Sequence, residues 1–145
     1  MTTNGRQLLV SAEQCIGCRA CATVCPEELI TLADADHRRT VWFAALCAED
    51  CTLCVEACPT DAIALRPVTG VVPEARTALS FELSPCAGCG APVATAEMLA
   101  WLRGVIPPQV QTDAEGQEWL GLCPRCRQQG EAQRMAREGI MTRWP

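Results

Sequence analysis

Short apolar runs alternate with polar and turn-forming residues along the first half of the chain, at residues 8–10, 29–32, 41–43 and 62–65. Runs of this length that carry β-branched or aromatic residues predict strands rather than helices. Residues 34–36, Asp-Ala-Asp, predict a turn that joins the second and third of these strands as a hairpin. Between the strands, residues 19–24 and 52–57 are expected to form short helices.

These elements form two copies of one unit, residues 6–33 and 40–66. Six residues recur 33 positions later: Cys18, Cys21, Cys25, Pro26, Ile30 and Leu32 return as Cys51, Cys54, Cys58, Pro59, Ile63 and Leu65. Cys15 and Cys47 are only 32 positions apart, so the second copy has one extra residue before Cys51. The fold class is therefore expected to be α+β, with an internal pseudo-two-fold repeat.

The pattern changes after residue 66. Residues 67–80 contain proline and glycine and little periodicity, which predicts an extended connector that could lie across a partner surface. The chain is then expected to consist of a first domain, this connector, a cysteine-containing module and an Arg-rich tail, at residues 1–66, 67–80, 81–128 and 129–145.

The module and the tail show helical spacing. Apolar residues predict a helix over 92–106 that ends at Pro107. Residues 109–122 predict a hairpin that turns at 113–116. Residues 127–141 predict a terminal helix, although the glycines at positions 130 and 139 have low helix propensity.

Twelve of the 145 residues are cysteine, which calls for a metal or disulfide framework. The first ten residues lack the features of a secretory signal, and no apolar run reaches the roughly 18 residues of a membrane span. A reducing, cytoplasmic location is therefore expected, where closely spaced cysteines are metal ligands. The formal net charge of −5 argues against nucleic acid as a partner.

Eight of the cysteines lie in two matched runs, Cys15-x2-Cys18-x2-Cys21-x3-Cys25-Pro26 and Cys47-x3-Cys51-x2-Cys54-x3-Cys58-Pro59. A [4Fe–4S] cube needs four thiolates; three closely spaced cysteines bind one cube, and the cysteine before the proline binds the other. Cluster I is then bound by Cys15, Cys18, Cys21 and Cys58, and cluster II by Cys47, Cys51, Cys54 and Cys25. A structural zinc array is the alternative, but zinc prefers pairs of ligands to runs of four. The chain is therefore expected to carry single electrons.

The surroundings of the two clusters are expected to differ in charge. An apolar shell is expected from Ile16, Val24, Ile30, Leu53, Val55 and Ile63. Arg19 lies in the first cysteine loop, whereas Glu49 and Asp50 lie in the second. Negative charge disfavours the addition of an electron, so cluster II is expected to have the lower potential; full solvation of these side chains would cancel the difference.

Cys86, Cys89, Cys123 and Cys126 form two C-x2-C pairs, which suit one tetrahedral ion. Four thiolates leave no open coordination position, so this site is expected to be structural or to transfer one electron. Zinc is the favoured ion; iron is the alternative, since such pairs are also typical of rubredoxin, and a disulfide is a further one. No Ser/His/Asp set, phosphate loop or acid–base carboxylate pair is apparent, so no catalytic residue is expected.

The eight-cysteine repeat resembles bacterial two-cluster ferredoxins, including the equivalent domain of respiratory complex I. The segments Cys86-Ala87-Gly88-Cys89-Gly90-Ala91-Pro92, Glu97 and Leu122-Cys123-Pro124-Arg125-Cys126-Arg127 are similar to the ferredoxin-like subunit of formate hydrogenlyase and related group 4 membrane-bound [NiFe] hydrogenases. This resemblance, over residues 10–128, implies a two-[4Fe–4S] ferredoxin fold followed by a zinc-ribbon or rubredoxin-like module. It also implies a relay between a hydrogenase small subunit and an iron–sulfur protein fed by a dehydrogenase, with membrane contact only through partner subunits. The extra residue before Cys51 and the short chain depart from that pattern and leave the electron donor open.

Three functions are compatible with the sequence. An electron-transfer subunit of a hydrogenase or formate hydrogenlyase-type complex is favoured, because a free, diffusing ferredoxin needs neither the cysteine module nor the Arg-rich tail. The free ferredoxin is the second. A redox-sensing zinc-ribbon regulator that binds nucleic acid is the third, and the negative net charge argues against it.

Overall fold

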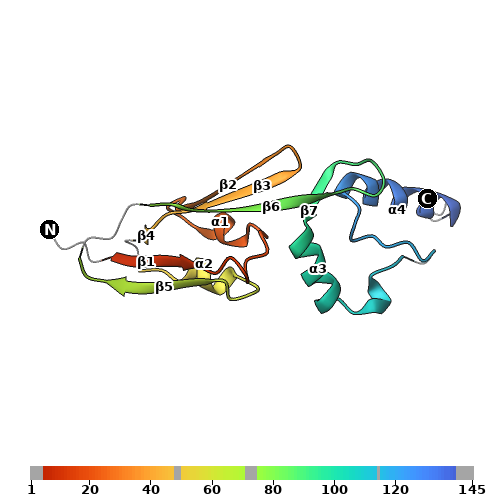
Figure 1. Ribbon diagram of the computed structural model, residues 1–145. Helices are drawn as coiled ribbons and strands as arrows, with labels where there is room; N and C mark the ends of the chain where they lie inside the picture. Colours follow the sequence, from red (N-terminus) through yellow and green to blue (C-terminus); the bar gives the residue numbers. More distant parts are fainter. Residues whose placement is uncertain (1–4, 48–49, 71–74, 114, 140–145) are drawn as a thin grey trace. The chain divides into compact units, whose positions relative to one another are not determined.

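The computed structural model describes residues 5–47, 50–70, 75–113 and 115–139, and the chain divides into two compact units, Met1–Glu82 and Leu83–Pro145. The first unit contains β1 (Gly5–Val10), α1 (Ala20–Val24), β2 (Ile30–Ala35), β3 (Arg38–Phe43), β4 (Leu46–Cys47), α2 (Leu53–Ala57) and β5 (Ile63–Val68) (Figure 1). Strand β6 (Thr77–Pro85) runs from the first unit into the second. The second unit continues with β7 (Pro92–Thr95), α3 (Ala96–Val105), the 3₁₀ helix η1 (Pro108–Val110) and α4 (Pro124–Arg137).

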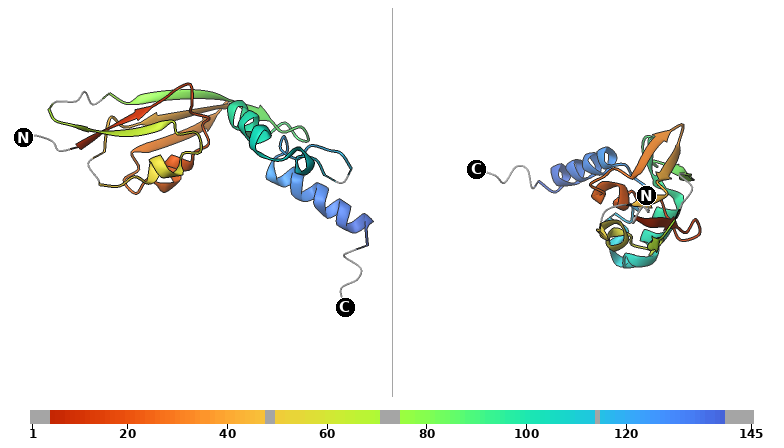
Figure 2. Two further views of the ribbon diagram at one scale, coloured as in Figure 1. Left: turned by 90° about the horizontal axis from the view of Figure 1, so that it is seen from below. Right: turned by 90° about the vertical axis from the view of Figure 1, so that its left-hand side faces the viewer.

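Strand pairing in the first unit follows the sequence repeat. β1 and β3 are equivalent in the two copies, as are β2 and β5, and each antiparallel pair takes one strand from each copy. In the β1–β5 pair Val10 lies opposite Ile63, and in the β2–β3 pair the equivalent Phe43 lies opposite Ile30. The β2–β3 pair confirms the hairpin predicted at residues 34–36. The two helices of this unit contact each other and lie side by side (Figure 2).

The end of the expected connector is a strand. Residues 77–80 belong to β6, and Thr77–Glu82 pairs antiparallel with β3. The physical reason is an apolar–polar alternation in which Leu79 is half-buried and Phe81 and Leu83 are buried. β6 therefore extends the sheet of its own chain, over residues that the sequence placed at the end of an extended connector.

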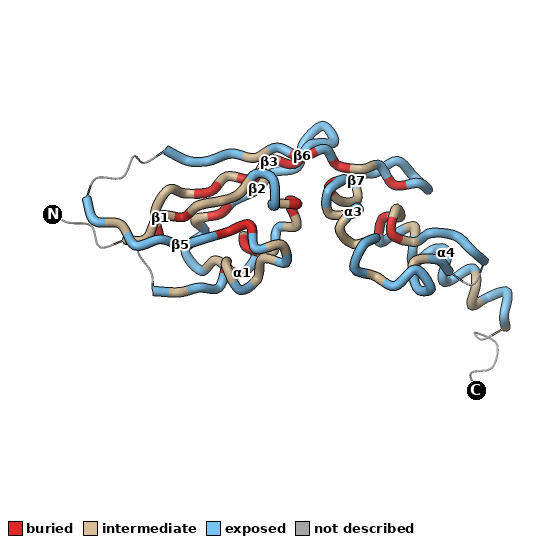
Figure 3. The backbone as a smooth tube through the Cα atoms, turned by 60° about the horizontal axis from the view of Figure 1, so that its bottom comes forward, coloured by how far each residue is buried: buried red, intermediate tan, exposed pale blue. Residues whose placement is uncertain are grey.

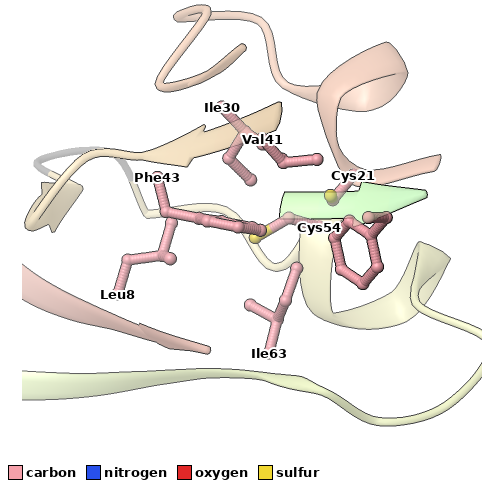
Figure 4. Close-up of a cluster of buried hydrophobic side chains, with 8 residues drawn as sticks. Leu8, Cys21, Ile30, Val41, Phe43, Cys54 and Ile63 are labelled. Atoms are coloured by element: carbon pink, nitrogen blue, oxygen red, sulfur yellow. The ribbon is translucent and has the colours of Figure 1, made fainter. Parts of the chain in front are cut away.

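The core of the first unit repeats the symmetry of the strands. Buried residues occur on β1, β2, β3, β5 and β6 (Figure 3). The cluster contains Leu8, Cys21, Ile30, Val41, Phe43, Cys54, Ile63 and Phe81. Figure 4 shows the sulfur atoms of Cys21 and Cys54 among these apolar side chains. Of the shell expected from the sequence, Ile16, Ile30 and Ile63 are buried and Val24 and Val55 half-buried, but the expectation for Leu53 is wrong because its side chain is 45% exposed on α2.

The second unit differs from expectation at the start of its first helix. The helix expected over 92–106 begins only at Ala96, because Thr95 caps it by accepting a hydrogen bond from the Met98 amide at 3.0 Å. Residues 92–95 instead form β7, which pairs antiparallel with the end of β6. An isolated bridge between Thr112 and Glu118 is consistent with a turn between them, but the hairpin expected over 109–122 is wrong at its start, where Pro108–Val110 form η1. Within the described ranges, no helix has the length and hydrophobicity that crossing a bilayer requires.

Candidate metal centres

A cavity in the first unit is bordered by the four cysteines expected to bind cluster I, Cys15, Cys18, Cys21 and Cys58. The first three come from the loop before α1 and from α1 itself, whereas the fourth ends α2 in the other copy. Ile16, Val41, Phe43, Ala62 and Ile63 also line the cavity. A [4Fe–4S] cluster needs four thiolates around one apolar space, so the residues present fit this group.

Cys21 is the most deeply placed sulfur of this set. Burial raises the pKa of the Cys21 thiol to about 12, and the charges of Cys18, Cys15 and Cys58 act in the same direction. Buried thiols that repel one another as thiolates ionise together only when a cation binds them. The structure therefore brings these four residues together around one space, where their thiols would ionise together only with a bound cation.

Cys54 is the equivalent of Cys21 in the second copy. Burial raises the pKa of the Cys54 thiol, and the charges of Cys25, Cys47 and Cys51 raise it further. These are the four cysteines expected to bind cluster II, so the structure groups them as it groups the first four. Beside them, Asp50 is exposed, while Glu49 lies outside the described residues.

The two cysteines that precede proline have the same local structure. Cys25 follows α1 with φ −74° and ψ 113°, and Cys58 follows α2 with φ −74° and ψ 115°. The amide of Leu29 donates a hydrogen bond to the Cys25 Sγ at 3.4 Å, and the amide of Ala62 donates to the Cys58 Sγ at 3.3 Å. Amide donors to ligand sulfur stabilise the thiolate, and this feature is repeated in both copies.

Arg39 contacts the first cysteine loop, a position that the sequence pattern does not indicate. Its side chain on β3 is buried, and it donates from Nε and Nη2 to the two carboxylate oxygens of Asp34, both at 2.8 Å. Its Nη1 donates to the Gly17 carbonyl at 2.8 Å. The Asp34 hydrogen bond raises the pKa of Arg39, and the charge of Cys18 raises it further. No spacing along the chain marks Arg39, because the strand pairing and the loop conformation determine its partners.

The four cysteines of the second unit lie close enough to bind a single ion. Their Sγ atoms all lie within 4.8 Å of one another, and the Cys89 and Cys123 sulfurs are 3.7 Å apart. Tetrahedral coordination with metal–sulfur bonds of about 2.3 Å gives a sulfur–sulfur distance of about 3.8 Å. The sulfur–sulfur bond of a disulfide, at about 2.05 Å, is far shorter than these distances. All twelve cysteines are free thiols in the structure. The arrangement therefore fits one tetrahedral ion.

Backbone geometry positions these sulfurs. Cys86 follows β6 and accepts hydrogen bonds from the amides of Cys123 at 3.2 Å and Gly88 at 3.3 Å. Cys123 is the N-cap of α4, with Pro124 at the first helical position, and its Sγ accepts from the Cys126 amide at 3.4 Å. The C-P-x-C sequence thus forms a helix start and places two thiols in the four-cysteine group.

The pKa values of these thiols diverge strongly. The Cys123 amide, followed by those of Cys89 and Gly88, lowers the pKa of Cys86 to about 6. The neighbouring sulfurs, led by Cys123, raise the pKa of Cys126 to about 12. The Cys86 thiol therefore ionises readily, whereas the Cys126 thiol stays protonated. All four cysteines would be thiolates at neutral pH only when a cation binds them.

Three comparisons describe the relationships of this chain. Residues 14–62 match the family model of the 4Fe-4S dicluster domain. The chain is 35% identical over 63 residues to an uncharacterized ferredoxin of Methanocaldococcus jannaschii, a match that covers 43% of this chain and 80% of that protein. It is 34% identical over 83 residues to the polyferredoxin protein MvhB of Methanothermus fervidus, covering 57% of this chain but only 19% of the polyferredoxin.

Proposed function

Because this chain belongs to the family of ferredoxins with 4Fe-4S dicluster domains, we propose that it relays single electrons inside a multi-subunit oxidoreductase of the hydrogenase or formate hydrogenlyase type. A [4Fe–4S] cluster, when bound, accepts and releases one electron. The chain's own residues hold the clusters and exclude water from them. The observation that carries the proposal is the grouping of eight cysteines into two sets of four, each drawn from both copies of the repeat.

We assign Cys15, Cys18, Cys21 and Cys58 to cluster I, and Cys47, Cys51, Cys54 and Cys25 to cluster II, in a bacterial two-cluster ferredoxin fold over residues 1–66. Support for the first set comes from the cavity that these four residues border. Support for the second set comes from the charges of three cysteines acting on Cys54. The buried side chains of Val41 and Phe43 would keep water from cluster I.

We assign a single zinc ion to Cys86, Cys89, Cys123 and Cys126, in a zinc-ribbon or rubredoxin-like module over residues 81–128. The sulfur spacing supports a mononuclear tetrahedral ion but does not distinguish zinc from iron. Zinc is favoured because a closed set of four thiolates is typical of structural zinc sites. An iron ion would add a further redox centre in place of a purely structural one.

The proposal of a partner rests on the segments of the chain that a free ferredoxin does not need for electron transfer. The cysteine module and α4, with its arginines, extend the chain beyond the dicluster domain. The similarity to a polyferredoxin supports a role beside other iron–sulfur proteins. The proposed partners are a hydrogenase small subunit and an iron–sulfur protein linked to a dehydrogenase, at the cytoplasmic face of the membrane.

Metal content tests the cofactor assignment. Protein prepared without oxygen is expected to contain about eight iron and eight sulfide per chain, together with one zinc. The Cys58→Ser variant is expected to lose iron and keep zinc, whereas Cys89→Ser is expected to lose zinc and keep iron, so each variant is the control for the other. Wild-type protein with far less iron and no broad visible absorbance would contradict the two-cluster assignment.

Affinity purification without oxygen tests the partner. The tagged chain, expressed from its own chromosomal position, is expected to bring down hydrogenase and further iron–sulfur subunits in fixed ratio. Elution as a monomer from a fresh cell extract would instead favour a free ferredoxin.

A further inference from the structure

Two arginines occupy equivalent positions in the two copies of the repeat, Arg6 on β1 and Arg39 on β3. The 33-residue offset that relates three of the four cysteine pairs, and the two paired strands, also relates these arginines. Each guanidinium donates a hydrogen bond to a backbone carbonyl in the cysteine loop of the other copy. Each arginine therefore contacts the copy to which it does not belong. The proposed fourth ligands, Cys25 and Cys58, likewise bind the cluster of the other copy.

The contact of Arg39 is in the interior. Its side chain is 6% exposed, and its Nη1 lies 2.8 Å from the carbonyl oxygen of Gly17. Gly17 is itself buried and has φ 65°, a left-handed conformation that shapes the loop between the first two ligands of cluster I. Holding this carbonyl fixes the peptide that leads directly into Cys18.

The contact of Arg6 is its counterpart in the other loop. Its Nη2 lies 2.6 Å from the carbonyl oxygen of Cys51, a proposed ligand of cluster II, and the bond is part-buried. Asp34, which pairs with Arg39, is replaced by Pro67 in the equivalent place of the other copy. Proline offers no carboxylate, so the Asp34 carboxylate beside Arg39 has no counterpart at position 67.

We propose that Arg39 and Arg6 are positioning residues that each hold one ligand loop and raise the reduction potential of the cluster bound there. Arg39 acts on cluster I and Arg6 on cluster II, an inference that rests on the proposed ligand assignment. Reduction adds one negative charge to a cluster, and a fixed positive charge in a poorly solvated site stabilises that state. Arginine suits this role because it stays protonated when buried.

Replacing each arginine by glutamine separates the effect of Arg39 on cluster I from the effect of Arg6 on cluster II. Arg39→Gln is expected to lower the midpoint potential of cluster I and leave cluster II unchanged, and Arg6→Gln is expected to do the reverse. The two variants are matched controls because they occupy equivalent positions. Potentials come from an EPR-monitored redox titration, and hyperfine-shifted NMR signals of the cysteine β-protons identify the cluster that is reduced.

Asp34 distinguishes a charge effect from loss of structure. Asp34→Asn removes the carboxylate that offsets Arg39, so the potential of cluster I is expected to rise, opposite in sign to Arg39→Gln. Arg39→Lys keeps the charge and is expected to stay closer to wild type than Arg39→Gln. A merely structural role predicts that the Asp34 and Arg39 variants shift the potential in the same direction.

Failure of this inference and failure of the proposed function give different experimental results. Variants that retain both clusters with unshifted potentials would overturn the inference alone, whereas a wild-type protein without two clusters would overturn the ligand assignment. If Arg39→Gln does not retain its clusters, Asp34→Asn decides: a potential for cluster I that is unchanged or lower overturns the role of Arg39.

Discussion

The absence of a side chain at Gly88 decides how closely the four cysteines of the second unit approach. A Cβ atom at this position would lie 3.0 Å from the Sγ of Cys126 and 3.4 Å from its Cβ. Contacts this short force a neighbour to move, and this neighbour is a proposed metal ligand. The amide of the same residue also donates to Cys86.

We therefore expect Gly88→Ala to weaken metal binding at the four-cysteine site, with strain of about 1–3 kcal/mol. A competition titration with a chromogenic chelator measures the affinity. Gly121→Ala is the matched control, because a Cβ there meets nothing within 4 Å. Equal affinities of the two variants would show that the close contact has no energetic role.

Arg39 shows why some site residues are not apparent from sequence. The eight proposed cluster ligands were apparent because three thiolates on one short loop have a fixed spacing that metal geometry imposes. The contacts of Arg39 with Asp34 and Gly17 depend instead on a hairpin register and on a loop conformation. Neither is set by spacing along the chain, so only the folded structure brings these residues together.

The elements were predictable where local pattern and tertiary packing agree. Four strands and both short helices of the first unit, namely β1, β2, β3, β5, α1 and α2, lie close to their predicted positions because the repeat gave each of them twice. β4 was not predicted, and neither was β6, whose alternation of Leu79, Phe81 and Leu83 follows directly on a segment with proline and glycine. β7 was missed because its four residues continue into the apolar pattern of α3.

Helix α4 contains a glycine and is followed by another, and the two have opposite roles. Gly130 lies inside the helix with open space where a side chain would be, whereas Gly139 follows its end with φ 68°. Glycine within a helix costs conformational entropy, while glycine after its end adopts a left-handed conformation that other residues resist.

Gly130→Ala is expected to stabilise the second unit by about 0.5–1 kcal/mol, and Gly139→Ala to destabilise it by about 1 kcal/mol. Denaturant unfolding of metal-loaded protein, followed by far-ultraviolet circular dichroism, measures both. The diagnostic result is that the same glycine-to-alanine substitution changes the free energy of unfolding in opposite directions at the two positions. Stabilisation by both would mean that Gly139 does not end the helix as described.

At the scale of the whole molecule, each compact unit has its own set of metal-binding cysteines. Small cores with few large side chains depend on such cross-links. In the first unit two of the eight core residues, Cys21 and Cys54, are proposed ligands, so cluster loss would disturb the core itself. The two units should therefore lose structure under different chemical treatments.

We expect a zinc chelator to increase hydrogen exchange in α3 and α4 while the visible absorbance of the clusters remains. Oxidative destruction of the clusters is expected to increase exchange in β1, β3 and β5 instead. Hydrogen-exchange mass spectrometry resolves these segments, and Cys89→Ser supplies the zinc-free reference. Simultaneous loss of protection in both units under the chelator would contradict this separation.

The cavity that Cys58 completes has a consequence for biosynthesis. Its other three cysteines lie in the first copy, whereas Cys58 is the last of the four cysteines of the second copy to be translated. A nascent chain that stops between the copies would present reactive thiols without the complete set of ligands proposed for cluster I. On that assignment, insertion of cluster I would follow the synthesis of Cys58, and the chain would have to be kept reduced until then.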